Sequence, residues 1–126
     1  MEQRILIVDD SPLLRATARR AALQAGVAAG AIREAANGAE ALEVLRAEPI
    51  DVVLLDINMP VMDGFAFVEE KAKDPSLAGA RVALVTTEGN KKRLARMTAL
   101  GVHHYLHKPF EPEALRALIR ELFEEA

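Results

Sequence analysis

The sequence alternates five times between a short apolar run and a longer segment with the apolar spacing of a helix. The clearest apolar runs are Ile5–Val8 and Val52–Leu55, and weaker strand patterns occur at residues 31–36, 81–85 and 103–107. Short apolar runs without polar alternation are typical of strands that are covered on both faces of a sheet. Their alternation with helices predicts parallel strands joined by right-handed crossovers. We therefore expect an α/β fold of the (βα)5 type, with a doubly wound parallel five-stranded sheet.

The segments between the runs carry signals for helix starts and stops. Ser11 followed by Pro12 predicts a capped helix, which should end near Gly26 because glycine readily adopts the left-handed conformation after a last turn. The last helix begins at Pro112 and has a continuous apolar stripe. The other three helices are expected to begin at Gly38, to span about residues 65–73, and to span residues 91–100 before Gly101.

Composition limits the function classes that the chain can serve. Its 126 residues suit one domain, residues 1–126, and we expect no output domain because Ala126 ends the last helix. A net charge of −3 and few aromatic side chains argue against a nucleic-acid-binding protein. The apolar runs are too short for a signal peptide or a membrane span, so we expect a cytoplasmic protein. The absence of cysteine excludes a thiolate metal site.

Polar side chains follow four of the five predicted strands. Asp9 and Asp10 follow the first strand, Asp56 the third, Thr86 and Thr87 the fourth, and Lys108 the fifth. Ligands of open α/β sheets bind beyond the carboxyl ends of the strands. We therefore expect these groups to line one shared cleft.

The charges in that cleft point to phosphate chemistry. Two carboxylates about 4 Å apart repel each other by roughly 4 kcal/mol at an effective dielectric constant near 20, and a hard cation such as Mg²⁺ relieves that repulsion. Lys108 offers a compact positive charge to a phosphate oxygen, and the Thr86 hydroxyl can donate to another. Asp56 can then act as a nucleophile toward phosphorus. The set of groups matches phosphoryl transfer to a carboxylate.

Taken together and in order, these residues resemble the motifs of response-regulator receiver domains, and the similarity covers the whole chain. The resemblance implies the flavodoxin-like strand order 2-1-3-4-5 and a cis bond between Lys108 and Pro109. It also assigns roles at the site. These are metal binding by Asp9, Asp10, Asp56 and the backbone carbonyl of Asn58, phosphoryl acceptance by Asp56, catalysis by Thr86 and Lys108, and switching by Thr86 and Tyr105.

The resemblance further implies a signalling mechanism rather than an enzyme with turnover. A histidine kinase gives its phosphoryl group to Asp56 with the help of Mg²⁺. Thr86 then moves toward the phosphate and Tyr105 turns inward, which changes how an unknown output protein binds the surface of helix four, strand five and helix five. Physically this is a shift between two pre-existing states. Only the protein's own phosphorylation and its slow dephosphorylation are implied as reactions.

Thr87 departs from the receiver pattern, which usually has alanine or glycine at this position. Our hypothesis is that its larger side chain restricts access to the phosphate and slows the loss of phosphate. Asn58 and Glu88 flank the same place, where the family tunes hydrolysis, and their polar character acts in the opposite direction.

Several alternatives stay open at this stage. The stretch at residues 86–91 is similar to single-domain chemotaxis regulators of the flagellar motor, and a relay intermediate that passes phosphate to another histidine protein fits almost as well. A magnesium-dependent phosphatase with an aspartate nucleophile would need a second acid where Asn58 stands. A flavodoxin-like cofactor binder would need an anion cradle where Asp9 and Asp10 stand.

Overall fold

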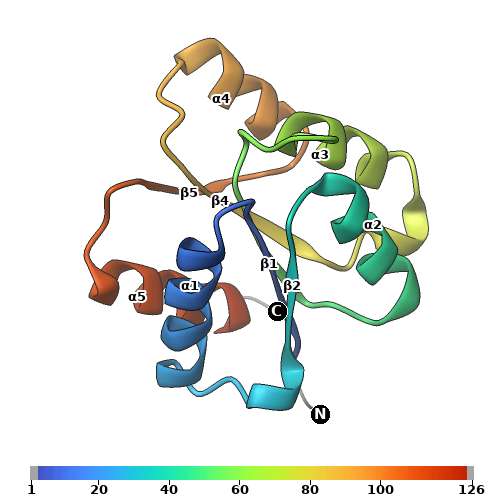
Figure 1. The fold of residues 1–126 in the computed structure, drawn as a ribbon. Coiled ribbons are helices and arrows are strands. Elements are labelled where there is room, and N and C mark those ends of the chain that lie inside the picture. The colour runs from blue at the N-terminus through green and yellow to red at the C-terminus, as the bar shows by residue number, and fades with distance from the viewer. Residues whose placement is uncertain (1–2, 125–126) are drawn as a thin grey trace.

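The computed structural model describes residues 3–124 and contains one parallel five-stranded sheet. The strand order is β2-β1-β3-β4-β5, which confirms both the predicted fold class and the strand order that the family resemblance implied. Figure 1 shows the sheet at the centre of the molecule with helices on both sides. The strands are β1 (Ile5–Val8), β2 (Ile32–Ala35), β3 (Val52–Leu55), β4 (Arg81–Thr86) and β5 (His104–His107).

Each strand is followed by a helix, as the alternation predicts. The helices are α1 (Pro12–Gln24), α2 (Gly38–Ala47), α3 (Gly64–Ala72), α4 (Lys91–Ala99) and α5 (Pro112–Glu124), with short 3-10 helices at Ala29–Ala31 and Pro75–Leu77. The Ser11 hydroxyl accepts a hydrogen bond from the Leu14 amide at 3.2 Å, so the predicted cap of α1 is confirmed. Gly26 and Gly101 both have positive φ, 102° and 95°, after α1 and α4, as a glycine stop requires.

The bounds of three strands differ from those predicted. β4 continues one residue further, through Thr86, because the Lys108 amide donates to the Thr86 carbonyl at 2.9 Å and extends the pairing with β5. β2 is shorter than residues 31–36 because the 3-10 helix at Ala29–Ala31 takes its first residue. β5 begins at His104, one residue later than predicted, where its pairing with Ala83 of β4 begins. Apolar spacing along the sequence does not reveal such pairing between segments.

The sheet separates two apolar cores. Side chains at alternate strand positions, such as Leu6 and Val8, pack against α2, α3 and α4, whereas Ile5 and Ile7 pack against α1 and α5. Figure 1 shows α1 and α5 together on one side and α2, α3 and α4 on the other. All four residues of β1 and of β3 are buried, so these strands hold their carboxyl ends firmly at the centre of the sheet.

The predicted domain bounds, Met1 and Ala126, lie outside the described residues. Within residues 3–124, none of the helices combines the length and the apolar character needed to cross a bilayer.

Glu48 connects Arg4, the residue before β1, with Arg33 of the neighbouring strand β2. It accepts hydrogen bonds from Arg4 at 2.7 Å and from Arg33 at 3.0 and 3.1 Å. The hydrogen bond from Arg33 is the main reason why the pKa of Glu48 lies below its ordinary value of 4.5. The ion pairs therefore favour the folded state only while Glu48 carries its charge.

These ion pairs of Glu48 predict that the stability difference between the wild type and Glu48→Gln depends on pH. A carboxyl group whose pKa is lower in the folded state stabilises that state above its unfolded pKa and loses the effect as the pH falls through its folded pKa. The Tm of Glu48→Gln should therefore lie below that of the wild type at about pH 7, and the gap should close as the pH falls below 4.5. Thermal unfolding at stepped pH measures this. Glu43→Gln, at an exposed position of α2, is the matched control, and an unchanged gap at all pH values contradicts the prediction.

Candidate functional site

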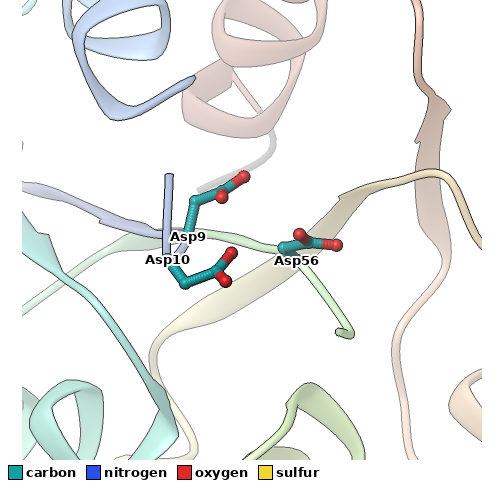
Figure 2. A group of neighbouring side chains, drawn as sticks. All are labelled: Asp9, Asp10 and Asp56. Atoms are coloured by element: carbon teal, nitrogen blue, oxygen red, sulfur yellow. The ribbon is translucent and has the colours of Figure 1, made fainter. Parts of the chain in front are cut away.

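Three carboxylates meet at the carboxyl ends of β1 and β3. Asp9, Asp10 and Asp56 each place an oxygen within 4.8 Å of the others, although Asp56 lies far from the pair in sequence. Figure 2 shows the three side chains gathered where these two strands end. β1 and β3 are direct neighbours in the sheet, with Val8 paired to Leu55, so the residue after each strand arrives at the same place. The three acids that were expected to share one place therefore do meet at this edge of the sheet.

Asp9 is buried and held by contacts on three sides. Its carboxylate accepts hydrogen bonds from the Ser11 amide at 2.9 Å and from the Lys108 ammonium at 2.7 Å. Its backbone carbonyl accepts from Arg15, one turn into α1, at 2.6 Å. These contacts fix the orientation of Asp9 before any ligand binds.

Asp10 differs from Asp9 because its side chain is exposed. Within the part of the chain that the structure describes, its carboxylate has no hydrogen-bond donor. Its two oxygens are therefore free to bind a cation without breaking an existing contact.

Asp56 combines burial with access to a cation. Its exposed fraction is 8 %, one carboxylate oxygen accepts from the Ile57 amide at 2.7 Å, and the other lies 3.4 Å from the Lys108 ammonium. Its own amide donates to the Val8 carbonyl at 3.0 Å, which ties it to β1. The carboxylate is thus oriented by two donors and stands beside Asp10.

Lys108 is the cation that spans the acids. The ammonium contacts both Asp9 and Asp56, and the side chain is 14 % exposed. Its backbone is fixed on one side by the bond to the Thr86 carbonyl and on the other by a cis peptide bond to Pro109, as the resemblance implied.

The loop after Asp56 passes very close to the start of α3. The Gly64 amide donates to the Ile57 carbonyl at 2.8 Å, and a side-chain carbon at Gly64 would lie 2.7 Å from the Asp56 carbonyl oxygen. Only glycine permits this approach. The Asp63-Gly64 pair in the sequence therefore positions the backbone of Asp56, in addition to capping α3 through the Asp63 side chain.

Thr86 and Tyr105 connect the site to the surface of β5. Thr86 is fully buried at the end of β4, and its hydroxyl accepts a hydrogen bond from the Glu88 amide at 3.3 Å. The Tyr105 hydroxyl donates to the Glu88 carbonyl at 2.6 Å while the side chain stays 41 % exposed. Burial and the nearby Glu88 charge raise the pKa of Tyr105, so it stays protonated as a donor near neutral pH. Both side chains therefore hold the same short segment.

The remaining predicted residues lie at the rim. Asn58 and Thr87 are exposed, and the Glu88 carboxylate forms an ion pair with Arg93 of α4 at 2.7 Å. The roles assigned to these three residues in tuning hydrolysis, and to the Asn58 carbonyl in binding metal, stay predictions.

The charge of the cluster suits a divalent cation. Three carboxylates and one ammonium leave two negative charges in a small volume. All the atoms that these carboxylates offer to a cation are oxygens. Mg²⁺ is typically held by one or two carboxylates together with water and phosphate. Asp9, Asp10 and Asp56 therefore fit Mg²⁺, with the exposed Asp10 side leaving room for water.

The similarity to known proteins agrees with this geometry. The model of the response regulator receiver domain matches residues 5–120. The chain belongs to the response regulator receiver domain family. A probable chemotaxis protein CheY of Rhizobium etli is 31% identical over 120 residues, which cover 95% of this chain and 92% of the relative. Chemotaxis protein CheY1 of Helicobacter pylori is 33% identical over 114 residues, 90% of each chain.

Solved structures show the same relationship for the receiver domain. Chemotaxis protein CheY4 of Vibrio cholerae has a TM-score of 0.86 at 31% identity and covers 97% of this chain and 99% of its own. A CheY-like receiver domain protein of Methanospirillum hungatei has a TM-score of 0.88 at 26% identity, with 99% of this chain covered and 96% of that protein. The predicted family is therefore confirmed, and the phosphatase and flavodoxin alternatives are not favoured.

Membership of the family defines the class of activity. Receiver domains are the signalling switches of two-component systems. They take a phosphoryl group from histidine kinases and act on output partners. They generally use Mg²⁺ at an acidic pocket, and the acidic cluster of this chain is consistent with that use.

Two contributors to the site were missed in the sequence. Arg15 supports the Asp9 backbone, and its position four residues after Ser11 places it on the same side of α1 as the cap. Arg93 holds the Glu88 side chain from α4. Arg93 belongs to the basic run at residues 91–93, which is typical of a solvated helix face. Its position in the sequence therefore does not indicate a contact with the site.

Proposed function

We propose that this chain is a cytoplasmic phosphorylation switch, with Asp56 as the phosphoryl acceptor and Asp9, Asp10, Asp56 and the Asn58 carbonyl as the Mg²⁺ ligands. The observation that carries the proposal is the contact of one largely buried lysine with two acids, Asp9 and Asp56. Beside them lies Asp10, whose carboxylate has no hydrogen-bond donor within residues 3–124. When bound, the metal ion supplies positive charge that neutralises phosphoryl oxygens.

The chain's own groups account for the transfer. A carboxylate oxygen of Asp56 forms the new bond to phosphorus, and the bond from phosphorus to the donor nitrogen of phosphohistidine breaks, with imidazole as the leaving group. The Lys108 ammonium, already 3.4 Å from Asp56, is positioned to contact a phosphoryl oxygen. The products are an acyl phosphate at Asp56 and the free histidine. Reactions beyond this acceptance and the slow hydrolysis of the acyl phosphate are not part of the proposal.

The proposed switch works through Thr86 and Tyr105. In the present structure the Thr86 hydroxyl accepts a hydrogen bond from the Glu88 amide. A phosphoryl group on Asp56 offers this hydroxyl an acceptor, so the hydroxyl moves toward the phosphate and away from the Glu88 amide. Such a change loosens the 86–88 segment, to which Tyr105 is also bound. Inward rotation of Tyr105 then alters the face formed by α4, β5 and α5, where the output protein binds. A shift of a 1:99 ratio to 99:1 requires about 5.5 kcal/mol of differential interaction.

We also propose chemotaxis signalling as the setting. Support comes from the relatives in Rhizobium etli and Helicobacter pylori, which are named as chemotaxis proteins and have nearly the same length as this chain. The similarity of residues 86–91 to flagellar-motor regulators points the same way. The output partner in that setting is a component of the flagellar switch.

Incorporation of phosphate from acetyl phosphate tests the proposal. Wild-type protein with Mg²⁺ should take up one phosphoryl group, whereas chelation of the metal or the change Asp56→Asn should abolish uptake. Asp63→Asn, which keeps a side chain able to cap α3, is the control and should label normally. Equal uptake by Asp56→Asn, or multiple turnover of a phosphorylated metabolite, would falsify the assignment.

Thr87→Ala tests the proposed effect of the departure from the family pattern. Thr87 is exposed immediately after the buried Thr86, so its side chain is available to shield a phosphoryl group on Asp56. Removal of that shield should admit water and speed the loss of phosphate several-fold. The decay of labelled protein after removal of acetyl phosphate measures the rate, with Thr98→Ala on the exposed side of α4 as control. An unchanged decay rate contradicts the shielding effect.

A further inference from the structure

A cleft of about 470 Å³ lies at the opposite end of the sheet from Asp56. Its floor includes Arg81, the first residue of β4, and residues 101–104, which lead into β5. Because the strands are parallel, their starts lie at the edge far from the acidic cluster. The walls come from the last turn of α3, the 3-10 helix after it and the end of α4. This cleft has no part in the phosphoryl chemistry described above.

Lys71 gives the cleft an unbalanced charge. It stands in the last turn of α3 and is half-buried, and among residues 3–124 no carboxylate forms an ion pair with it. Burial lowers its pKa, and no neighbouring acid acts against that effect. Removal of an ammonium from water without a partner costs free energy, which an anion in the cleft would recover.

Further positive and titratable groups face the same space. Arg81, His103 and His104 line the cleft together with Lys71. The one acid in the lining is Asp74, whose carboxylate is already engaged by the amide and hydroxyl of Ser76 at 3.0 and 2.7 Å. Lys71 therefore remains a cation of the lining that has no carboxylate partner among residues 3–124.

The rest of the lining is apolar. Its main members are Val68, Pro75, Val82, Leu100 and Val102. The volume is far larger than an inorganic ion and falls within the range of about 300–1,000 Å³ that is typical of small-molecule sites. The ligand therefore needs an apolar body as well as a negative charge.

We propose that this cleft is a binding site for a small organic anion, a carboxylate with an aromatic or aliphatic body, whose charged group pairs with Lys71. The apolar body lies against Val82 and Val102, and the carboxylate points toward α3. The proposal concerns a site that is separate from Asp56, so it stands or fails independently of the phosphorylation switch.

Amide chemical shifts during titration with 2-naphthoate test the site in the full-length protein. We expect saturable shifts at residues 71–82 and 100–104, with a Kd at or below about 1 mM. The neutral analogue 2-naphthalenemethanol should bind at least tenfold more weakly, since it lacks the charge. Lys71→Gln should weaken 2-naphthoate binding at least tenfold, whereas Lys71→Arg should keep most of it.

Lys73→Gln is the matched control, because Lys73 is the residue directly after α3, lies outside the lining of this cleft, and pairs with Glu70. It should bind 2-naphthoate as the wild type does. If Lys71 served only to offset the negative end of the α3 dipole, Lys71→Gln would lower the Tm and leave the titration unchanged, which overturns the proposal. Shifts confined to other surfaces, or equal affinity for the neutral analogue, also overturn it.

Discussion

Replacement of Lys108 by methionine is expected to slow phosphorylation of Asp56 by about 10²- to 10³-fold, the usual cost of losing one pre-positioned donor to a developing negative charge. The ammonium contacts both Asp9 and Asp56 and is largely buried, so no solvent molecule supplies an equal charge. Methionine keeps most of the side-chain volume and removes only the charge. The rate of phosphate uptake from acetyl phosphate, measured at saturating Mg²⁺, gives the effect directly.

The same variant should be less stable without metal and should recover with it. Loss of one member of a buried ion pair costs about 3–5 kcal/mol because the remaining charge is left uncompensated. Magnesium restores positive charge among the acids, so urea denaturation should show a larger Mg²⁺-dependent gain for Lys108→Met than for the wild type. Lys91→Met, at an exposed position of α4, is the control for both measurements. A Lys108→Met protein with a normal phosphorylation rate contradicts the role of this lysine.

Asp10→Asn is expected to lower the affinity for Mg²⁺ at least tenfold while leaving the metal-free fold intact. The Asp10 carboxylate is exposed and has no donor in the described part of the chain, so its charge contributes nothing to folding that asparagine would lose. Its removal reduces the net negative charge of the cluster from two to one, which weakens the attraction for a divalent ion. Calorimetric titration with Mg²⁺ measures the affinity.

The stability of Asp10→Asn separates a metal ligand from a capping residue. If Asp10 is a metal ligand whose charge only repels the neighbouring acids, Asp10→Asn should be as stable as the wild type without metal, or slightly more stable. A residue needed to cap α1 should destabilise the protein when it is changed. In the structure, Ser11 rather than Asp10 caps α1. Glu43→Gln removes a distant exposed charge and should change neither quantity; an unaltered Mg²⁺ affinity in Asp10→Asn argues against its place in the site.

Much of the fold could be predicted because the strong local signals agree with the tertiary structure. The runs at β1 and β3 are apolar throughout since both faces of these central strands are covered, and they end at the acids that the site uses. Glycine after α1 and α4 stops both helices with positive φ. The meeting of Asp9, Asp10 and Asp56 follows from parallel pairing of β1 with β3, which the strand order that the family resemblance implied already contained.

The parts that could not be predicted depend on contacts between distant segments. The extension of β4 through Thr86 needs the Lys108 amide from the next βα unit. Arg93 reads as a solvated basic residue, yet it pairs with Glu88 and also lies over the Phe65 ring at 4.6 Å. The outward hydrogen bond of Tyr105 to the Glu88 carbonyl depends on the conformation of a loop, which apolar periodicity does not encode.

The most direct test of phosphorylation at Asp56 locates the phosphoryl group itself. Protein treated with acetyl phosphate and Mg²⁺ is reduced with borohydride, which converts an acyl phosphate of aspartate to homoserine, and the peptides are then sequenced by mass spectrometry. We expect homoserine at position 56 alone. Homoserine at Asp9 or Asp10, or none anywhere despite measured phosphate uptake, would contradict it.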